Sequence, residues 1–220
     1  MKVVVIANGE WDAHWGQMKL EQEKIDCLIC ADGGGNLAIS SGKVPDILVG
    51  DLDSITPENL KICRENNTQI EEYPRKKNET DLELALKYAE TVLQSHGKQE
   101  DEIHLYAGGG KRLDHLLGNI ALLLHAAENN RRVKMIDQTF SAWVILPGKE
   151  TICGIPGQEL SLIPLSESAE VTSRGLYYEL NRLCLRQDTA RGISNVFRDN
   201  GAEIEVHHGK VFLVLLEKKS

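Results

Sequence analysis

Short runs of apolar residues, separated by longer helical stretches, most strongly constrain how this chain can fold. They lie before residue 138, at 2–7, 26–31, 46–50, 68–73, 102–108 and 132–137. Several, such as "KVVVIA" and "DCLICA", are apolar at consecutive positions, as expected of strands that are covered on both faces. Strands that alternate with helices form parallel sheets. We therefore predict an α/β domain over residues 1–138, with a parallel sheet flanked by helices.

Helix start signals support this alternation. Thr56 followed by Pro57 suits an N-cap and a first helical position, and Thr80 with Glu83 forms a capping box. A third helix is expected to begin near Arg112, because leucines recur at helical spacing after it.

The pattern changes after residue 138. Glycine and proline interrupt the chain at short intervals, no long helical period remains, and the segments between them have the pattern of short strands and hairpins. We predict an all-β, sandwich-like domain over residues 139–220.

Composition excludes several classes of function. The chain has 220 residues, 25 Lys and Arg against 33 Asp and Glu, and a net charge of −8, with no basic stretch long enough to follow a phosphate backbone. No segment approaches the length of a membrane span, and no export signal is evident. The five cysteines are an odd number and are expected to be reduced thiols. We expect a cytoplasmic protein that binds neither nucleic acid nor membrane.

Acidic residues follow four successive predicted strands. Because ligands bind beyond the carboxyl ends of the strands in an open parallel sheet, these acids are expected to gather at one edge. A hard divalent cation such as Mg²⁺ would explain so much like charge in one place. For Asp81, favourable interaction with the helix dipole is an equal alternative. The acids are Asp32 after the second strand, Asp51 and Asp53 after the third, Asp81 after the fourth and Asp114, followed by His115, after the fifth.

A glycine triplet after the fifth predicted strand could bind an anion, in contrast to the acids. Gly108 to Gly110 allow backbone amides to surround an anion, and Lys111 and Arg112 follow at a helix start. Lys77 could reach the same phosphates, whereas we favour a solvated position for Lys76. Acids for Mg²⁺ together with phosphate-binding groups are typical of phosphoryl transfer. The chain has neither the P-loop nor the kinase glycine-rich signature, so another nucleotide-using family is indicated.

The motifs closely resemble, in order and spacing, those of thiamine pyrophosphokinases. They are "ADGGG", "GDLDS", "KNETD", "GKRLDH" followed by "GNIALL", "VTSRGLYYEL" and "GISN", and they extend over nearly the whole chain. The resemblance implies a parallel α/β domain followed by a β-sandwich, a homodimer with active sites at the subunit interface, and Mg²⁺-dependent transfer of pyrophosphate from ATP to the thiamine hydroxyl, which releases AMP. Thiamine and ATP would be the ligands.

The resemblance also implies roles for single residues. Asp51, Asp53 and Asp81 would be the Mg²⁺ ligands and, with Asp114, the catalytic acids; either Asp81 or Asp114 would accept the hydroxyl proton. The groups implied at ATP and its phosphates are Asp32, Gly33, Gly34, Lys77, Thr80, Gly110, Arg112 and His115. Those implied at thiamine are Tyr178, Ser194 and Asn195.

Three positions depart from the family pattern. Asn78 replaces an acid and cannot be a charged ligand, Lys111 replaces a glycine of the loop, and Tyr178 stands where tryptophan is usual. Tyrosine can still stack on a cationic ring, although tryptophan is the better partner.

Two alternatives stay open at this point. A pyrophosphokinase for another alcohol, such as a hydroxymethylpterin, would need the same phosphate machinery. A non-catalytic sensor of nucleotide or thiamine diphosphate would be favoured by Asn78 and Lys111, but the four intact aspartates argue against it.

Overall fold

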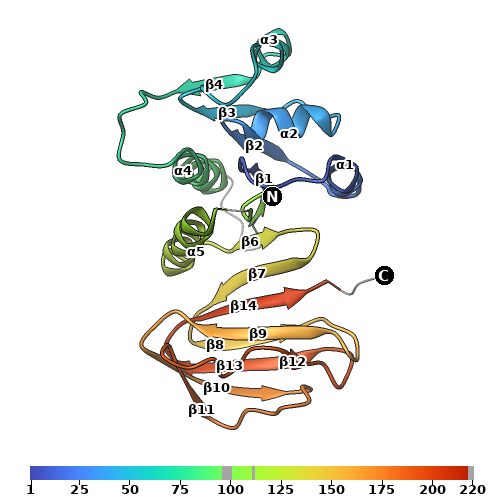
Figure 1. The fold of residues 1–220 in the computed structure, drawn as a ribbon, viewed down its shortest axis with the longest axis vertical. Coiled ribbons are helices and arrows are strands. Elements are labelled where there is room, and N and C mark those ends of the chain that lie inside the picture. The colour runs from blue at the N-terminus through green and yellow to red at the C-terminus, as the bar shows by residue number, and fades with distance from the viewer. Residues whose placement is uncertain (96–100, 111, 218–220) are drawn as a thin grey trace. The chain divides into compact units, whose positions relative to one another are not determined.

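The computed structural model describes residues 1–95, 101–110 and 112–217, which form two compact units. The N-terminal unit combines Met1–Leu122 with Arg131–Gln138, and the C-terminal unit combines Leu123–Asn130 with the chain from Thr139 onward. Figure 1 labels the elements of both units. None of the described helices has the length and apolarity needed to cross a membrane.

The N-terminal unit is built on six parallel strands of a sheet, in the order β6-β5-β1-β2-β3-β4. All six predicted strands are present, and the predicted α/β class is confirmed. The strands are β1 (Lys2–Ile6), β2 (Cys27–Ala31), β3 (Ile47–Gly50), β4 (Gln69–Glu72), β5 (Glu102–Tyr106) and β6 (Val133–Ile136).

The helices begin where the start signals predict. Thr56 Oγ1 accepts a hydrogen bond from the Asn59 amide at 3.2 Å, and Thr80 Oγ1 accepts one from the Glu83 amide at 3.1 Å. These caps satisfy amides that have no partner inside the helix. The helices are α1 (Ala13–Gln22), α2 (Gly34–Ser40), α3 (Pro57–Glu65), α4 (Asp81–Gln94) and α5 (Leu113–Glu128).

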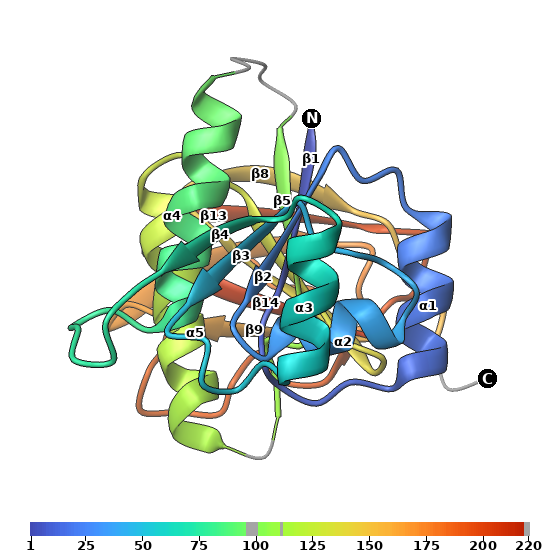
Figure 2. The same ribbon diagram turned by 90° about the horizontal axis from the view of Figure 1, so that it is seen from above.

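Helices cover both faces of this sheet, which explains why its strands are apolar at consecutive positions. On one face, Val4 and Ile6 of β1 share a core with Leu20 of α1, Ala38 of α2 and Cys63 of α3. Helix α4 packs against β1, β2 and β3 on the other face, and Figure 2 shows α4 on the opposite side of the strands from α1, α2 and α3.

The strand order reverses direction beside β1. The chain proceeds from β1 outward through β2, β3 and β4, then returns to β5 on the other side of β1. Loops after β1 and β5 therefore diverge, and this reversal is where open α/β sheets bind ligands.

The C-terminal unit contains two sets of antiparallel strands, in the orders β12-β9-β14-β7 and β11-β10-β13-β8. Both contribute to one core, which includes Leu160, Val171, Ile204 and Leu213. The predicted sandwich-like class is confirmed, although the strand expected at "GISNVF" is limited to two residues. The strands are β7 (Phe140–Ile145), β8 (Gly148–Ile152), β9 (Glu159–Pro164), β10 (Ser168–Arg174), β11 (Leu183–Arg186), β12 (Asn195–Val196), β13 (Ala202–His208) and β14 (Val211–Leu216).

Candidate active site

A cavity of about 840 Å³ lies within the N-terminal unit, at the carboxyl ends of β1, β2, β3 and β5. It occupies the reversal of strand order beside β1, where a ligand site is expected. The residues predicted from the sequence that line it are Asp32, Asp51, Asp53, Thr80, Asp81, Gly110, Arg112, Asp114 and His115.

Asp32 is held rigidly at the end of β2. Its side chain is buried, its φ is +43°, and its carboxylate accepts hydrogen bonds from the amides of Ser54 and Ile55, each at 3.2 Å. Burial raises the pKa of Asp32 against the lowering effect of these hydrogen bonds, and the negative charge of Asp81 raises it further. Asp32 thus fixes the turn that follows β3.

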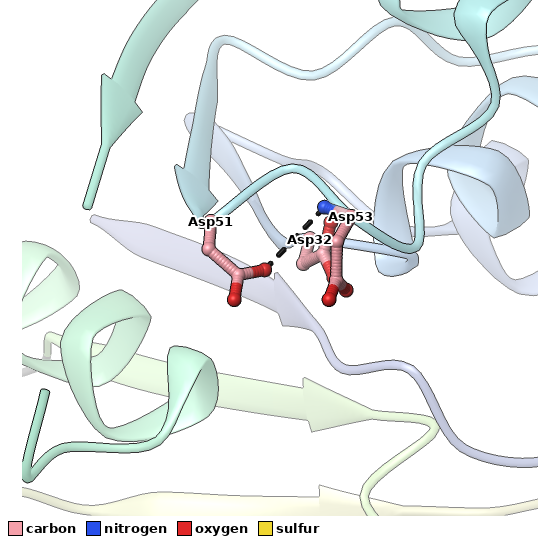
Figure 3. Close-up of side chains that lie close together, drawn as sticks. All are labelled: Asp32, Asp51 and Asp53. Atoms are coloured by element: carbon pink, nitrogen blue, oxygen red, sulfur yellow. Dashed lines mark hydrogen bonds between the residues drawn. The ribbon is translucent and has the colours of Figure 1, made fainter. Parts of the chain in front are cut away.

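The turn after β3 brings Asp51 and Asp53 together through a backbone conformation that the sequence does not predict. An extended backbone would direct both side chains the same way, but β3 ends at Gly50 and Leu52 adopts a left-handed φ of +60°. The Asp53 amide donates to Asp51 Oδ1 at 3.4 Å. As Figure 3 shows, the carboxylates of Asp32, Asp51 and Asp53 converge, with one oxygen from each lying within 4.8 Å of the others.

Asp53 is the most exposed member of this trio. The Ser54 hydroxyl donates to its Oδ1 at 3.0 Å, and Nη2 of Arg75 lies 2.7 Å from its Oδ2. These contacts, that of Ser54 first, lower the pKa of Asp53. The carboxylate is therefore ionised and ready to bind a cation at neutral pH.

Asp81, at the first position of α4, completes the acidic wall. Its Oδ1 lies 2.9 Å from Nζ of Lys77. Burial acts to lower the pKa of Lys77, but the hydrogen bond and charge of Asp81, with the charges of Asp51 and Asp32, outweigh it and raise that pKa. Gly50 allows the close approach, because a Cβ there would lie 2.9 Å from Asp32 Cβ and 3.1 Å from Asp81 Oδ1.

The opposite side of the cavity is formed by the loop after β5 and the start of α5. Arg112 holds Asp114 through two hydrogen bonds, Nε to Oδ1 at 2.9 Å and Nη2 to Oδ2 at 2.6 Å. The Arg112 guanidinium lowers the pKa of Asp114. Gly110 has a φ of +141°, which favours glycine. Lys111, which stands where the family pattern has a glycine, lies outside the described residues.

Gly33 and Gly34 do not line the cavity, and they serve close packing instead. A Cβ on Gly34 would lie 2.2 Å from the carbonyl oxygen of Ile6, and one on Gly33 would lie 2.4 Å from the Asn8 side chain. These glycines let the start of α2 press against the end of β1. Lys77 also lies outside the described lining of the cavity. It contacts Asp81, which does line the cavity.

The structure brings together the three residues predicted at thiamine, inside the C-terminal unit. Asn195 is buried and holds the backbone of Tyr178, accepting from its amide at 3.1 Å and donating to its carbonyl at 2.7 Å. Ser194 precedes it with a left-handed φ of +55°. The ring of Tyr178 is 63% exposed and lies 5.0 Å from the ring of Tyr177. Asn195 therefore orients an exposed aromatic surface.

Several lining residues were missed from the sequence. Asn8 and Glu10 follow β1, and Asn119 of α5 donates to the Gly108 carbonyl at 2.7 Å. The rule that ligands meet the ends of strands applies equally to "ANGE" after the first strand and would have found the first two. Asn119 lies in the quoted motif "GNIALL", although no role was predicted for it, and the contact of Arg75 with Asp53 depends on how two loops fold back.

The acidic cluster suits a hard divalent cation. Asp32, Asp51 and Asp53 offer only oxygen donors, which Mg²⁺ prefers, and their oxygens are close enough for one ion to reach all three. Asp81, on the neighbouring helix, adds a fourth carboxylate at the same wall.

Comparison with known proteins decides the family. A family model described as "Thiamin pyrophosphokinase, catalytic domain" matches residues 18–135, more than half of the chain. The chain belongs to the thiamine pyrophosphokinase family. A second model, "Thiamin pyrophosphokinase, vitamin B1 binding domain", matches residues 149–211. The resemblance inferred from the motifs is confirmed, and with it the prediction that the chain is an enzyme of this class.

Individual thiamine pyrophosphokinases agree with this assignment. The Bacillus subtilis protein is 32% identical over 169 residues, which are 76% of each chain, and a rice relative is 27% identical over 84% of this chain and 76% of its own. The crystal structure of the Bacillus subtilis enzyme superposes with a TM-score of 0.85 at 24% identity and covers 100% of both chains. The Candida albicans structure gives 0.85 at 18% identity and covers 99% of this chain and 89% of its own. These structural matches establish the fold.

Proposed function

We propose that this protein transfers the pyrophosphoryl group of ATP to the hydroxyl of thiamine, forming thiamine diphosphate and AMP. The thiamine oxygen bonds to the β-phosphorus, the bond from that phosphorus to the oxygen bridging it to the α-phosphate breaks, and AMP leaves with that oxygen. The observation that carries the proposal is the acidic wall of Asp32, Asp51, Asp53 and Asp81 in a cavity at the strand-order reversal. Family membership supports the choice of reaction.

Asp51 and Asp53, with Asp81 beside them, are the proposed ligands of Mg²⁺. The ion would neutralise charge on the transferring phosphates. Asp32 contributes mainly by holding the turn that carries Asp51 and Asp53, since its oxygens already accept backbone amides. Lys77 pairs with Asp81 in the ligand-free site, with Nζ 2.9 Å from Oδ1.

The remaining lining groups are proposed to orient the phosphates and accept the proton. Arg112, Thr80, His115 and the backbone around Gly110 offer hydrogen-bond donors on the cavity wall. Asp81 or Asp114 accepts the thiamine hydroxyl proton as the new bond forms. The two hydrogen bonds from Arg112 lower the pKa of Asp114 and so weaken it as a base.

Residues 1–138 are proposed to bind the nucleotide and residues 139–220 to bind thiamine. The exposed ring of Tyr178, beside Ser194, supports contact with a cationic ring. We also propose a homodimer, which light scattering at assay concentration would check. A cytoplasmic location completes the proposal, supported by five cysteines that are all free thiols.

The test is to identify the nucleotide product formed from ATP and Mg²⁺ with thiamine, with a hydroxymethylpterin, or with no alcohol. We expect AMP with thiamine only. AMP with the pterin alone would reassign the acceptor, and ADP would indicate an ordinary kinase. Absence of any nucleotide product would favour the non-catalytic sensor.

A further inference from the structure

The loop between β4 and α4 brings two basic side chains to the acidic wall, and each pairs with a different acid. Lys77 Nζ lies 2.9 Å from Asp81 Oδ1, and Arg75 Nη2 lies 2.7 Å from Asp53 Oδ2. Asp53 belongs to the turn after β3, whereas Asp81 begins α4. One short loop thus supplies the counter-ion for acids on two separate elements.

The two pairs differ in how firmly they are held. The side chain of Lys77 is only 10% exposed, whereas that of Arg75 is 72% exposed and that of Asp53 is 39% exposed. An exposed ion pair is weak and easily exchanged, because water and salt screen it. Arg75 can therefore leave Asp53 at little cost, while Lys77 stays with Asp81.

The charges at the wall are not balanced by these two bases. Four aspartates, Asp32, Asp51, Asp53 and Asp81, face two paired cations. When all four carboxylates are ionised, two negative charges remain without a cation from this loop, so the wall attracts a divalent ion even while Arg75 is in place. An ion that ligates Asp53 would bring like charge next to the Arg75 guanidinium, which must then move away.

We propose that Arg75 is an exchangeable counter-ion, which holds Asp53 in the ligand-free enzyme and transfers to the phosphates of ATP when a divalent cation takes Asp53. The inference rests on the proposed function and adds a nucleotide-binding residue to it. A guanidinium is suited to this exchange, because its planar fork binds carboxylate and phosphate oxygens equally well.

This exchange couples binding of the metal ion to binding of the nucleotide. Arg75 competes for Asp53 with a metal ion that binds without nucleotide. When the metal ion binds together with ATP, the phosphates accept the guanidinium, and Arg75 then favours binding. The free site then discriminates against the bare ion in favour of the metal–nucleotide complex, a coupling between two ligands at one site.

Two affinities of the Arg75→Gln variant test the proposal. The first is for Mn²⁺ alone, read from the electron paramagnetic resonance signal of the free ion. The second is for the Mg²⁺ complex of a non-hydrolysable ATP analogue, measured by calorimetry. Lys76→Gln is the matched control, because Lys76 is the neighbouring exposed base and makes no ion pair in the described part of the chain. Arg75→Lys tests whether charge alone suffices.

The two affinities are expected to change in opposite directions. Loss of Arg75 should tighten Mn²⁺ binding about two- to fivefold, as for other exposed pairs, and weaken binding of the nucleotide complex about tenfold, as for a lost charged hydrogen bond. Lys76→Gln should change neither affinity in this way. Arg75→Lys should restore most of the competition with Mn²⁺ and only part of the nucleotide affinity.

Two results would overturn this inference. If both affinities fall, Arg75 only supports the loop; if neither changes, the pair with Asp53 has no role in binding. Failure of the unaltered enzyme to bind the nucleotide complex would instead overturn the proposed function, and the Mn²⁺ measurement, made without nucleotide, separates the two failures.

Discussion

The carboxylates that share the cavity are held to different degrees at the scale of single residues. Asp32 is fixed by the amides of Ser54 and Ile55, while Asp53 is bound through the exposed side chain of Arg75 and the hydroxyl of Ser54. An acid whose oxygens are committed to the backbone serves best as a support, and one held by exchangeable partners can turn to a ligand. Identical residue types thus have different roles because their hydrogen-bond partners differ.

Replacement of Asp53 should separate catalysis from folding. We expect Asp53→Asn to retain the fold, because the side chain is exposed, and to reduce kcat about a hundredfold or more, as the loss of charge stabilisation at a reacting phosphate does. The measurements are AMP formation and thermal unfolding by circular dichroism. Asp188→Asn, at another exposed and arginine-paired aspartate, is the control and should keep the native rate. A near-native rate for Asp53→Asn would remove Asp53 from the chemistry.

The sequence predicted which acids share a wall, but not how they reach it. Asp32, Asp51, Asp53 and Asp81 were placed from the rule that strand ends meet at one edge, which depends only on strand order along the chain. The left-handed Leu52 could not be predicted, because leucine does not favour that conformation and the amides that bind Asp32 impose it. Arg75 was missed for a similar reason, since its partner lies on another loop.

At the scale of elements, the position of α2 depends on a glycine. We expect Gly34→Ala to lower the free energy of unfolding by about 1–3 kcal/mol, because the new methyl group would overlap the Ile6 carbonyl and force β1 and α2 apart. Gly118→Ala is the control, since nothing lies within 4 Å of a Cβ there and alanine favours a helix by up to about 1 kcal/mol. Urea unfolding measures both. Equal stabilities of the two variants would contradict this account of the glycine.

A buried charged cluster joins the end of α1 to strands β1 and β5. His104 of β5 contacts Glu23 after α1 through Nδ1 and Glu102 through Nε2, the latter at 2.8 Å. Tyr106 and Lys2 also donate to Glu23, at 2.6 and 2.9 Å, and Arg132 lies 3.3 Å from Glu102. Burial opposes ionisation of both partners, yet the contacts outweigh it: they raise the pKa of His104 and lower that of Glu23 to about 2.

This cluster should make stability depend on pH. Because the pKa of folded His104 exceeds its unfolded value of 6.5, its contribution is complete below pH 6.5 and is lost as pH rises through the folded pKa. The contribution of Glu23 is complete above its unfolded pKa of 4.5 and is lost as pH falls through about 2. Urea unfolding between pH 5.5 and about 9 should therefore show a decline that His104→Gln lacks.

The control for this dependence is His14→Gln, an exposed histidine on α1. It should decline with pH as the unaltered protein does. If His104→Gln declines in parallel with the unaltered protein, another group is responsible for the pH dependence. This cluster could not be predicted from the sequence, because Glu23 and His104 are distant in the chain and meet only through the packing of α1 beside β5.

Whether a segment forms a helix or a strand could be predicted where neighbouring residues carry a signal for it. The threonine caps of α3 and α4 and the apolar runs of the six parallel strands are local features, and the structure confirms them. The segment at 195–196 was expected to be longer because its residues favour strands, but Asn195 is committed to the backbone of Tyr178 and the segment pairs only briefly with β9.

At the scale of the whole molecule, the chain forms two compact units. The N-terminal unit has the parallel sheet and the acidic cavity, and the C-terminal unit has its own core and the exposed aromatic surface around Tyr178. The two family models match these regions separately. The change of pattern near residue 138 was visible in the sequence because parallel and antiparallel strands differ in hydrophobic pattern.

The acidic cavity is proposed to support transfer of an intact pyrophosphoryl group, and the fate of the γ-phosphate distinguishes this from transfer of a single phosphoryl group. The measurement is a ³¹P nuclear magnetic resonance time course of ATP, Mg²⁺ and thiamine with the unaltered protein. We expect signals of AMP and of a diphosphate ester of thiamine to appear together and in equal amounts. Signals of ADP with thiamine monophosphate would contradict it, because they would mean attack at the γ-phosphorus.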